Sequence, residues 1–350
     1  MAFMQTTDLI RAIVDVLPEP AMVISAEGRI LAANSATQAL FPAMRMGDLL
    51  ALNLRAPDIL DAMARVRAEG KTESVLWLER VPVERLFDVH IALIETPDQP
   101  HALMLALRDL TELRRVERMR VDFVANASHE LRTPLASLLG FIETLQGAAR
   151  DDSIARERFL KIMYEQARRM ARLVDDLLSL SRIEQNLHLR PEQPVDLGLV
   201  VRHIVDTLSS MANEGKVQLK LQVAGNVMVT GDRDELLRVA ENLIENAIKY
   251  GSSAKPGEQA LVEIEVDAGP RQARLSVRDY GPGIASEHLP RLTERFYRVD
   301  AGESRSKGGT GLGLAIVKHI VARHRGRLTI VSKLGEGTQA EITLPVYSDD

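Results

Sequence analysis

The segment FVANASHELRTPL, residues 123–135, places a histidine, a carboxylate and a hydroxyl within five positions: His129, Glu130 and Thr133. These are residue types that acid–base and group-transfer chemistry uses. An idle surface histidine is the alternative interpretation. The neighbouring residues decide how this segment is presented.

An apolar stripe in the same segment indicates where His129 points. An α-helix turns by about 100° per residue, so His129 lies roughly 120–160° away from the stripe and faces water. Thr133 follows one turn later on the same face as His129. Pro134 cannot donate a backbone hydrogen bond to Glu130, and we expect the helix to bend there. The stripe has spacings of 4, 3, 4 and 3 and consists of Leu131, Leu135, Leu138, Ile142 and Leu145.

A second group of polar residues lies in ENLIENAIKY, residues 241–250. Asn242, Asn246 and Lys249 occupy neighbouring positions of an otherwise apolar helix. Amide oxygens are hard ligands that suit a magnesium ion that keeps most of its waters, and the lysine supplies positive charge for phosphates. A polar helix face without a ligand is the alternative.

Two glycine-containing segments follow. In RDYGPGI, residues 278–284, a strand ends at Asp279, whose carboxylate can accept a hydrogen bond from an exocyclic amine such as adenine N6. In KGGTGLGLAIVKHI, residues 307–320, a glycine-rich loop enters a helix, and free backbone N–H groups there can bind an anion. This loop has neither Walker A nor Rossmann spacing. The preceding ERFYRVDAGESRSK has few apolar anchors and predicts a mobile lid.

Composition restricts the possible functions. The chain has 350 residues, of which 45% are apolar and 27% charged, enough for two or three globular domains. It contains no cysteine, which excludes disulfides, thiolate metal sites and cysteine nucleophiles. A net charge of −5 gives no field that favours nucleic acid. We find no apolar run near the length of a membrane span, so membrane association is not encoded in these residues.

Three regions are expected: residues 1–108, 109–190 and 191–350. The first predicts an antiparallel sheet with short helices. Its strands are expected at 21–25, 29–34, 74–79, 86–94 and 102–109, and its helices at 36–41 and 57–68. This order resembles a PAS sensor domain.

The second region predicts a helical hairpin with a tight loop at 146–153. Its second helix carries a heptad stripe of Phe159, Met163, Gln166, Met170, Leu173, Leu177 and Leu180. One hairpin with narrow stripes buries little surface, so a four-helix bundle from two chains is the natural completion.

The third region predicts a mixed α/β sandwich of a common domain size. Its helices are expected at 197–214, 234–250 and 312–324, and its strands at 217–223, 227–230, 260–267, 273–279, 328–332 and 340–344. The whole chain is therefore expected to be a multidomain α+β protein.

In their order and spacing, these motifs resemble the sensor histidine kinases of two-component systems. SHELRTPL is similar to their H box, NLIENAIKY to the N box, DYGPG to the G1 box, RFYR to the F box and GTGLGL to the G2 box. The resemblance implies a dimeric phosphotransfer hairpin followed by a Bergerat-type ATP-binding domain. LTERFYRVD and GGTGLGLAIVKHIVARHRGRL are similar to the phosphate-regulon sensor kinases.

The resemblance also implies residue roles. His129 would accept the phosphoryl group, Glu130 would act as its general base and Thr133 would serve regulator dephosphorylation. Asn246 would hold Mg²⁺. The residues implied to bind ATP are Asn242, Asn246, Lys249, Tyr250, Asp279, Gly281, Gly283, Arg298, Gly309, Thr310, Gly311, Leu312 and Gly313.

The implied protein is a cytoplasmic homodimer, or the cytoplasmic part of a longer membrane sensor, that uses ATP and Mg²⁺. It would phosphorylate itself and then an aspartate of a separate response regulator. Two other functions are weighed against this one: an ATP-driven clamp and a non-catalytic sensor module. The signal, the regulator and the choice between phosphorylation within or across subunits stay open.

Overall fold

The computed structural model describes residues 6–54, 56–80, 83–96, 99–187, 189–251, 260–300 and 309–348. The chain divides into two compact units, Met1–Val124 and Ala125–Asp350. The predicted domain limits at 108/109 and 190/191 stay predictions. Among the described residues, no helix is both long and apolar enough to cross a membrane.

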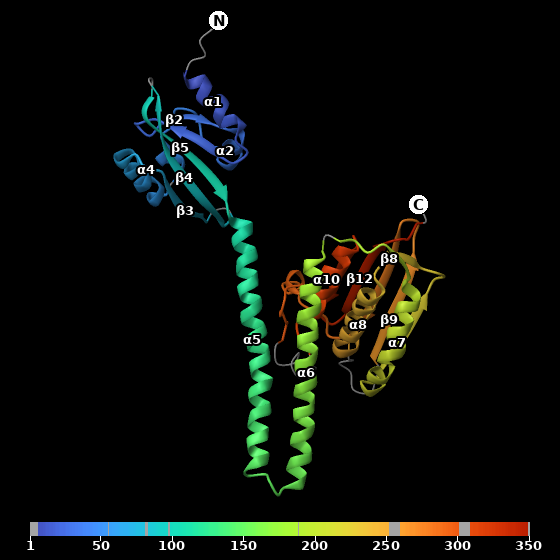
Figure 1. Ribbon diagram of the computed structural model, residues 1–350. Coiled ribbons are helices and arrows are strands. Elements are labelled where there is room, and N and C mark those ends of the chain that lie inside the picture. The colour runs from blue at the N-terminus through green and yellow to red at the C-terminus, as the bar shows by residue number, and fades with distance from the viewer. Residues whose placement is uncertain are drawn as a thin grey trace. The chain divides into compact units, whose positions relative to one another are not determined.

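The first unit contains the predicted antiparallel sheet, with strand order β2-β1-β5-β4-β3 (Figure 1). Its strands are β1 Ala21–Ile24, β2 Ile30–Ala33, β3 Glu73–Glu79, β4 Arg85–Thr96 and β5 Gln99–Asp109. The helices α2 Ser35–Leu40 and α4 Pro57–Glu69 were predicted, whereas α1 Thr6–Val16 and α3 Leu50–Asn53 were not. The PAS resemblance of this unit stays a prediction.

Alternating side chains explain the core of this unit. One face of the sheet packs under α4 through a cluster that includes Ile59, Met63 and Phe87, all buried. The other face packs against α1, where Ile10 and Val14 are buried one turn apart. Because a strand points successive side chains to opposite faces, one sheet can build both cores.

The helical hairpin consists of α5 Thr111–Gln146 and α6 Ser153–Gln185, close to the predicted limits. Asp152 caps α6 by accepting a hydrogen bond from the backbone N–H of Ala155 at 2.9 Å. The rings of Phe141 and Phe159 pack between the helices with centroids 5.1 Å apart. At Pro134, where we expected a bend, α5 continues as one helix.

The remaining part carries a five-stranded sheet of order β11-β12-β10-β9-β7, in which only the β7–β9 pair is parallel. The strands are β7 Val217–Val223, β9 Ala260–Ala268, β10 Gln272–Asp279, β11 Arg327–Lys333 and β12 Gly337–Pro345. The helices α7 Leu197–Glu214, α8 Arg233–Tyr250 and α10 Gly313–Arg323 pack on it (Figure 1). Burial alternates along β9, so one face of this sheet is covered by the helices.

These elements confirm the predicted α/β sandwich. One short addition is a two-stranded sheet made by β6 Gln193–Asp196 and β8 Met228–Gly231. The strand β8 was predicted and β6 was not. Leading directly into α7, β6 ends at Asp196, whose carboxylate caps that helix through the N–H of Leu199.

Candidate functional site

A cavity of about 490 Å³ lies where α8, the end of β10, the glycine-rich loop and α6 meet. Most of the residues predicted to bind a nucleotide line it. They are Asn242, Asn246, Lys249, Tyr250, Asp279, Gly283, Arg298, Gly309, Thr310, Gly311 and Gly313. The structure therefore brings residues of separated motifs together around one cavity, and their role in binding a nucleotide stays a prediction.

The helix α8 presents its polar residues to this cavity because its other face is buried in the core. Asp232 starts the helix by accepting hydrogen bonds from the N–H groups of Asp234 and Glu235. The apolar face, which includes Leu243 and Ile244, is buried. Asn246 then falls on the cavity side.

The polar side chains of α8 are held within the helix itself. The Asn242 amide donates to the carbonyl of Arg238 at 2.8 Å. The Lys249 ammonium lies 2.8 Å from the carboxylate of Glu245 and is 14% exposed. This leaves the amide oxygen of Asn242 against the start of α10, where a side chain at Gly313 would collide with it. The glycine is therefore required by close packing.

Asp279 is a buried carboxylate at the end of β10. It accepts hydrogen bonds from the backbone N–H groups of Gly281 at 2.9 Å and Thr338 at 3.3 Å. Burial raises the pKa of Asp279, while the two backbone N–H groups act in the lowering direction. Both bonds use Oδ1, so the carboxylate is held in one orientation beside the cavity.

The glycines shape the cavity in different ways. Gly283 has φ +70° and Gly311 has φ +74°, and a side chain at either would also strike backbone, at Lys333 and at Phe296. Two predicted residues do not line the cavity. Gly281 packs against the backbone of Tyr250 instead, and Leu312 is buried at the N-terminus of α10. They hold the walls in place.

We predict that Gly283→Ala lowers the free energy of unfolding by about 3 kcal/mol or more, since backbone strain and a backbone collision combine. Nucleotide affinity should fall at least about tenfold with it. Gly335→Ala is the matched control: Gly335 has φ +79° but open space around it, so a loss of about 1 kcal/mol is expected. Chemical unfolding followed by equilibrium nucleotide titration measures both quantities. Equal losses in the two variants would contradict the collision.

His129 is exposed on α5, as predicted. The hydroxyl of Thr133 donates to the backbone carbonyl of His129 at 3.2 Å, so the two residues share one face across one turn. Glu130 points elsewhere: its carboxylate contacts Arg169 of α6 at 3.1 Å and Arg298 at 3.0 Å. The residue beside the histidine is thus joined directly to a residue that lines the cavity.

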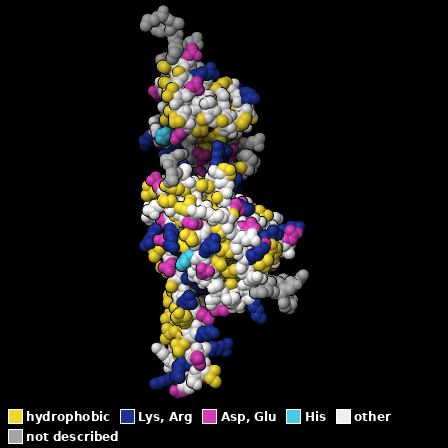
Figure 2. Space-filling model, turned by 90° about the vertical axis from the view of Figure 1, so that its right-hand side faces the viewer, with side chains coloured by type: hydrophobic (Ala, Val, Ile, Leu, Met, Phe, Trp, Pro, Cys, Tyr) yellow, Lys and Arg dark blue, Asp and Glu magenta, His cyan; other side chains and the backbone are white. Residues whose placement is uncertain are grey.

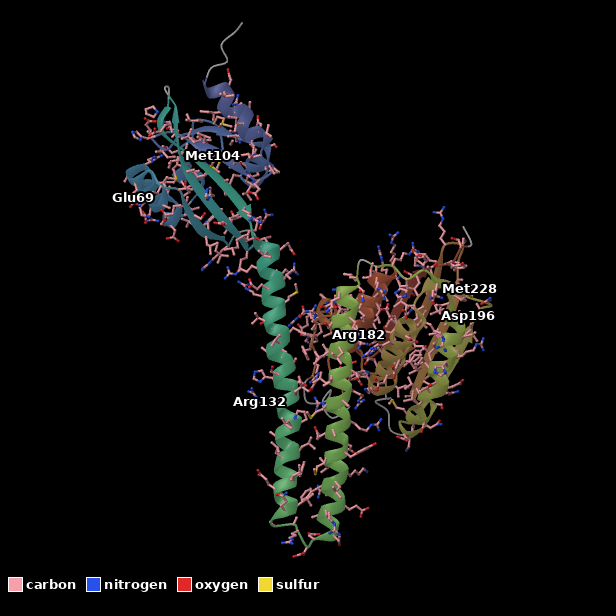
Figure 3. All side chains as sticks on the ribbon, in the orientation of Figure 1. Glu69, Met104, Arg132, Arg182, Asp196 and Met228 are labelled. Atoms are coloured by element: carbon pink, nitrogen blue, oxygen red, sulfur yellow. The ribbon has the colours of Figure 1, made fainter. Side chains whose placement is uncertain are left out.

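Sequence reasoning missed the residues that α6 contributes to the cavity. Arg172, Asp175 and Asp176 line it, and Asp176 contacts Arg238 at 2.7 Å and the hydroxyl of Thr310 at 2.8 Å. The upper part of α6, marked by Arg182 in Figure 3, lies beside α10. Acidic residues that flank a heptad stripe are usually solvated, so the sequence held no signal for this contact.

The side chains that line the cavity are suited to bind Mg²⁺ only together with the phosphates of a nucleotide. Among the described residues, no group of three or more His, Cys, Asp or Glu could hold a metal ion. The cavity is nevertheless lined by Asn242 and Asn246, whose side chains carry amide oxygens, and by Glu241 and Glu245 of the same helix. Magnesium commonly takes one or two protein oxygens and completes its shell with water and substrate phosphates. The residues present therefore fit Mg²⁺ brought by a nucleotide.

Two family models match the chain. Residues 119–186 match the His Kinase A (phospho-acceptor) domain, and residues 231–348 match the histidine kinase-, DNA gyrase B- and HSP90-like ATPase. The second match assigns ATP as the nucleotide of this part of the chain. It covers the cavity residues on α8, β10 and α10 described above.

Curated relatives agree with both models. The phosphate regulon sensor protein PhoR of Pseudomonas aeruginosa is 41% identical over 235 residues, which are 67% of this chain and 52% of that protein. The sensor protein kinase WalK of Staphylococcus aureus is 39% identical over 242 residues, 68% of this chain and 39% of that protein. The chain thus spans about half or less of the length of these relatives.

A solved structure of the histidine kinase ThkA, in complex with the response regulator protein TrrA, shares the fold. It has a TM-score of 0.51 at 20% identity and covers 96% of this chain and 98% of that chain. Together, the phospho-acceptor match on the hairpin, the ATPase match around the cavity and the kinase relatives show that this chain belongs to the sensor histidine kinases.

Proposed function

We propose that this chain is an ATP-dependent protein histidine kinase that phosphorylates itself on His129 and transfers the phosphoryl group to an aspartate of a response regulator. One observation carries the proposal. An exposed histidine on the hairpin is followed by Glu130, whose carboxylate reaches Arg298 at the cavity. Acceptor and nucleotide site therefore belong to one compact unit.

The proposed nucleotide site uses each wall of the cavity for one part of ATP. Asp279, fixed by two backbone N–H groups, is suited to accept from the adenine amine. Tyr250 would lie against the nucleotide. Lys249 and Arg298 supply positive charge for the phosphates, and the loop Gly309–Gly313 supplies backbone N–H groups at the start of α10.

In the proposed reaction, a neutral His129 ring nitrogen attacks the γ-phosphorus in line. The N–P bond forms as the bond to the bridging oxygen of ADP breaks. Glu130 takes the ring proton that the attacking imidazole gives up. Asn246, with Asn242 beside it, would hold Mg²⁺, which supplies charge neutralisation on the phosphates when bound. For Glu130 to act as base, its carboxylate has to leave the two guanidinium groups that it contacts here.

We also propose that the active protein is a homodimer through the hairpin. Apolar residues on both helices stay exposed in the single chain, among them Leu135 at 47%, Leu139 at 53% and Leu160 at 52%. Figure 2 shows hydrophobic side chains along the part of the hairpin that extends away from the α/β sandwich. Burying these stripes against a second copy would complete a four-helix bundle.

The proposed partner is a response regulator acting in trans. The proposal is supported by ThkA, which shares this fold and whose structure is a complex with the response regulator protein TrrA. Residues 1–108 are proposed as a PAS-like sensor domain, 109–190 as the phosphotransfer hairpin and 191–350 as the ATP-binding domain. We propose that these domains function in the cytoplasm, alone or as part of a longer membrane sensor.

Incubation of the purified protein with γ-labelled ATP tests the central proposal. A phosphohistidine is labile in acid and stable in base, which separates it from serine, threonine and tyrosine phosphates. Label that is acid-labile, and that moves to a response regulator added afterwards, is the expected result. Absence of protein-bound label, with ATP hydrolysis retained, would favour an ATPase instead.

Thr133→Ala should retain autophosphorylation and phosphotransfer yet lose most dephosphorylation of the regulator, about tenfold or more. The hydroxyl of Thr133 donates its hydrogen bond to the His129 carbonyl. Its oxygen keeps a lone pair that can accept a hydrogen bond from a water directed at a phosphoaspartate. The assay follows phosphate release from pre-phosphorylated regulator with ADP or ATP present.

Thr144→Ala is the control for that variant, because Thr144 makes the same bond to a carbonyl four residues back, Gly140, at 2.7 Å on the same helix. It should leave all three activities unchanged. Undiminished dephosphorylation by Thr133→Ala would remove the role.

A further inference from the structure

Two carboxylates of the hairpin contact residues that the proposed function assigns to the phosphates of ATP. Glu130 of α5 binds Arg298 through both terminal nitrogens, at 3.0 and 3.4 Å. Asp176 of α6 accepts from the hydroxyl of Thr310 at 2.8 Å. These contacts come from different helices of the hairpin and meet the same cavity.

The donors in these contacts are already used. A threonine hydroxyl can donate only one hydrogen bond, and the hydroxyl of Thr310 donates it to Asp176. The same oxygen accepts a hydrogen bond from the N–H of Leu312 at 3.3 Å. The Arg298 side chain is 6% exposed, both of its terminal nitrogens face Glu130, and its Nε is buried without a hydrogen-bond partner. A phosphate therefore has to displace Asp176 to accept from the hydroxyl of Thr310, and it competes with Glu130 for the guanidinium of Arg298.

Charge acts in the same direction as the hydrogen bonds. Asp176 is half-buried and paired with Arg238 at 2.7 Å, which holds its carboxylate at the cavity wall beside Gly309 and Gly311. A carboxylate that is fixed at the cavity wall repels the negatively charged triphosphate, and this repulsion is stronger where water is partly excluded.

We propose that Asp176 is an internal competitor of the nucleotide: the hairpin places a carboxylate where the phosphates of ATP would bind, so hairpin docking and nucleotide binding oppose each other. The inference rests on the proposed nucleotide site, whose regulation it describes. Glu130 does the same at Arg298, and displacing it from Arg298 removes one of the two guanidinium contacts that hold the proposed general base. The contact with Arg169 has to be released as well before Glu130 can act as a base.

The opposite role for Asp176 is that it positions Thr310 for the nucleotide. The two roles differ in sign. A competitor that is removed raises the affinity for phosphates, whereas a positioning residue that is removed lowers it. Equilibrium binding therefore decides between them without any phosphoryl transfer.

The first test is Asp176→Ala in the full chain, with Mg·ADP as the probe. We expect affinity to rise about fivefold or more, the lower range of measured site-to-site couplings. Adenosine, which has no phosphates, should bind the variant and the parent protein equally. Asp175→Ala is the matched control: Asp175 lines the same cavity but has no hydrogen bond or ion pair among the described residues, so it should shift Mg·ADP affinity by less than half as much.

Unchanged or weaker Mg·ADP binding by Asp176→Ala would overturn the inference, as would an equal gain in Asp175→Ala. A failure of the proposed function is distinguishable, because it appears as missing acid-labile phosphate in the parent protein. Loss of phosphorylation with tighter binding by the variant would leave the competition intact.

The second test keeps both carboxylates. The chain has no cysteine, so two can be introduced for spin labels at exposed positions, Arg158 on α6 and Ser209 on α7. If hairpin docking weakens nucleotide binding, nucleotide binding must weaken docking by the same factor. Saturating Mg·ADP should therefore shift or broaden the distribution of distances between the two labels, and adenosine should shift it less. A distribution that Mg·ADP leaves unchanged would contradict the opposition between docking and binding.

Discussion

Replacing His129 by glutamine is expected to abolish acid-labile phosphate on this protein. An amide nitrogen has its lone pair delocalised and does not attack phosphorus, whereas the neutral imidazole does. Because His129 is exposed, the glutamine fits without disturbing the packing of α5. Affinity for Mg·ATP and self-association should stay within about twofold of the parent, since the change removes no buried contact.

A control histidine isolates the effect. His203 is also exposed on a helix, α7, and His203→Gln should retain full phosphorylation. Incorporation of label from γ-labelled ATP, measured against time for both variants, gives the comparison. Acid-labile phosphate on the His129 variant would show that another residue is the acceptor.

The parts of the site that sequence predicted are local ones. The strand that ends at Asp279, the glycine-rich entry to α10 and the polar face of α8 each follow from short patterns, because capping, turns and helical periodicity are decided by neighbours in the chain. The exposed position of His129 followed from one apolar stripe in the same way.

Contacts between distant segments could not be predicted. The partners of Glu130 lie 39 and 168 residues away, and that of Thr310 lies 134 residues away. The contact between Glu130 and Arg169 joins the two helices of the hairpin, so it depends on how these helices pack. The other two contacts join the hairpin to the α/β sandwich, so they depend on how the hairpin is docked. A heptad stripe shows which face of a helix is apolar but says nothing of which charged neighbour its flanks will meet.

The helix α1 and the strand β6 were not predicted, for different reasons. The helix α1 was overlooked although Ile10 and Val14 have helical spacing, since a single pair in a short segment is a weak signal. The strand β6 has the sequence QPVD and pairs only with β8. A proline in a four-residue edge strand gives no periodicity to detect.

Asn246→Asp is the second large effect that we expect. Asn246 lines the cavity on the polar face of α8, and its neutral amide oxygen can share a cation with the nucleotide phosphates. The aspartate has nearly the same shape but adds a negative charge beside those phosphates. The rate of autophosphorylation should fall roughly 100-fold, the size of effect seen when one preorganised electrostatic contact is lost.

The binding measurements make the assignment specific. Repulsion acts on phosphates, so the affinity for Mg·ATP should fall while that for adenosine stays unchanged. Asn213→Asp makes the same chemical change at an exposed position near the end of α7, and it should leave both the rate and the affinities as they are. Raising the concentration of magnesium should not restore the rate, because the added charge opposes the phosphates whether or not the cation is bound. A variant at Asn246 that phosphorylates itself at the parental rate would show that this amide is not the ligand and would move the metal to another oxygen of the cavity.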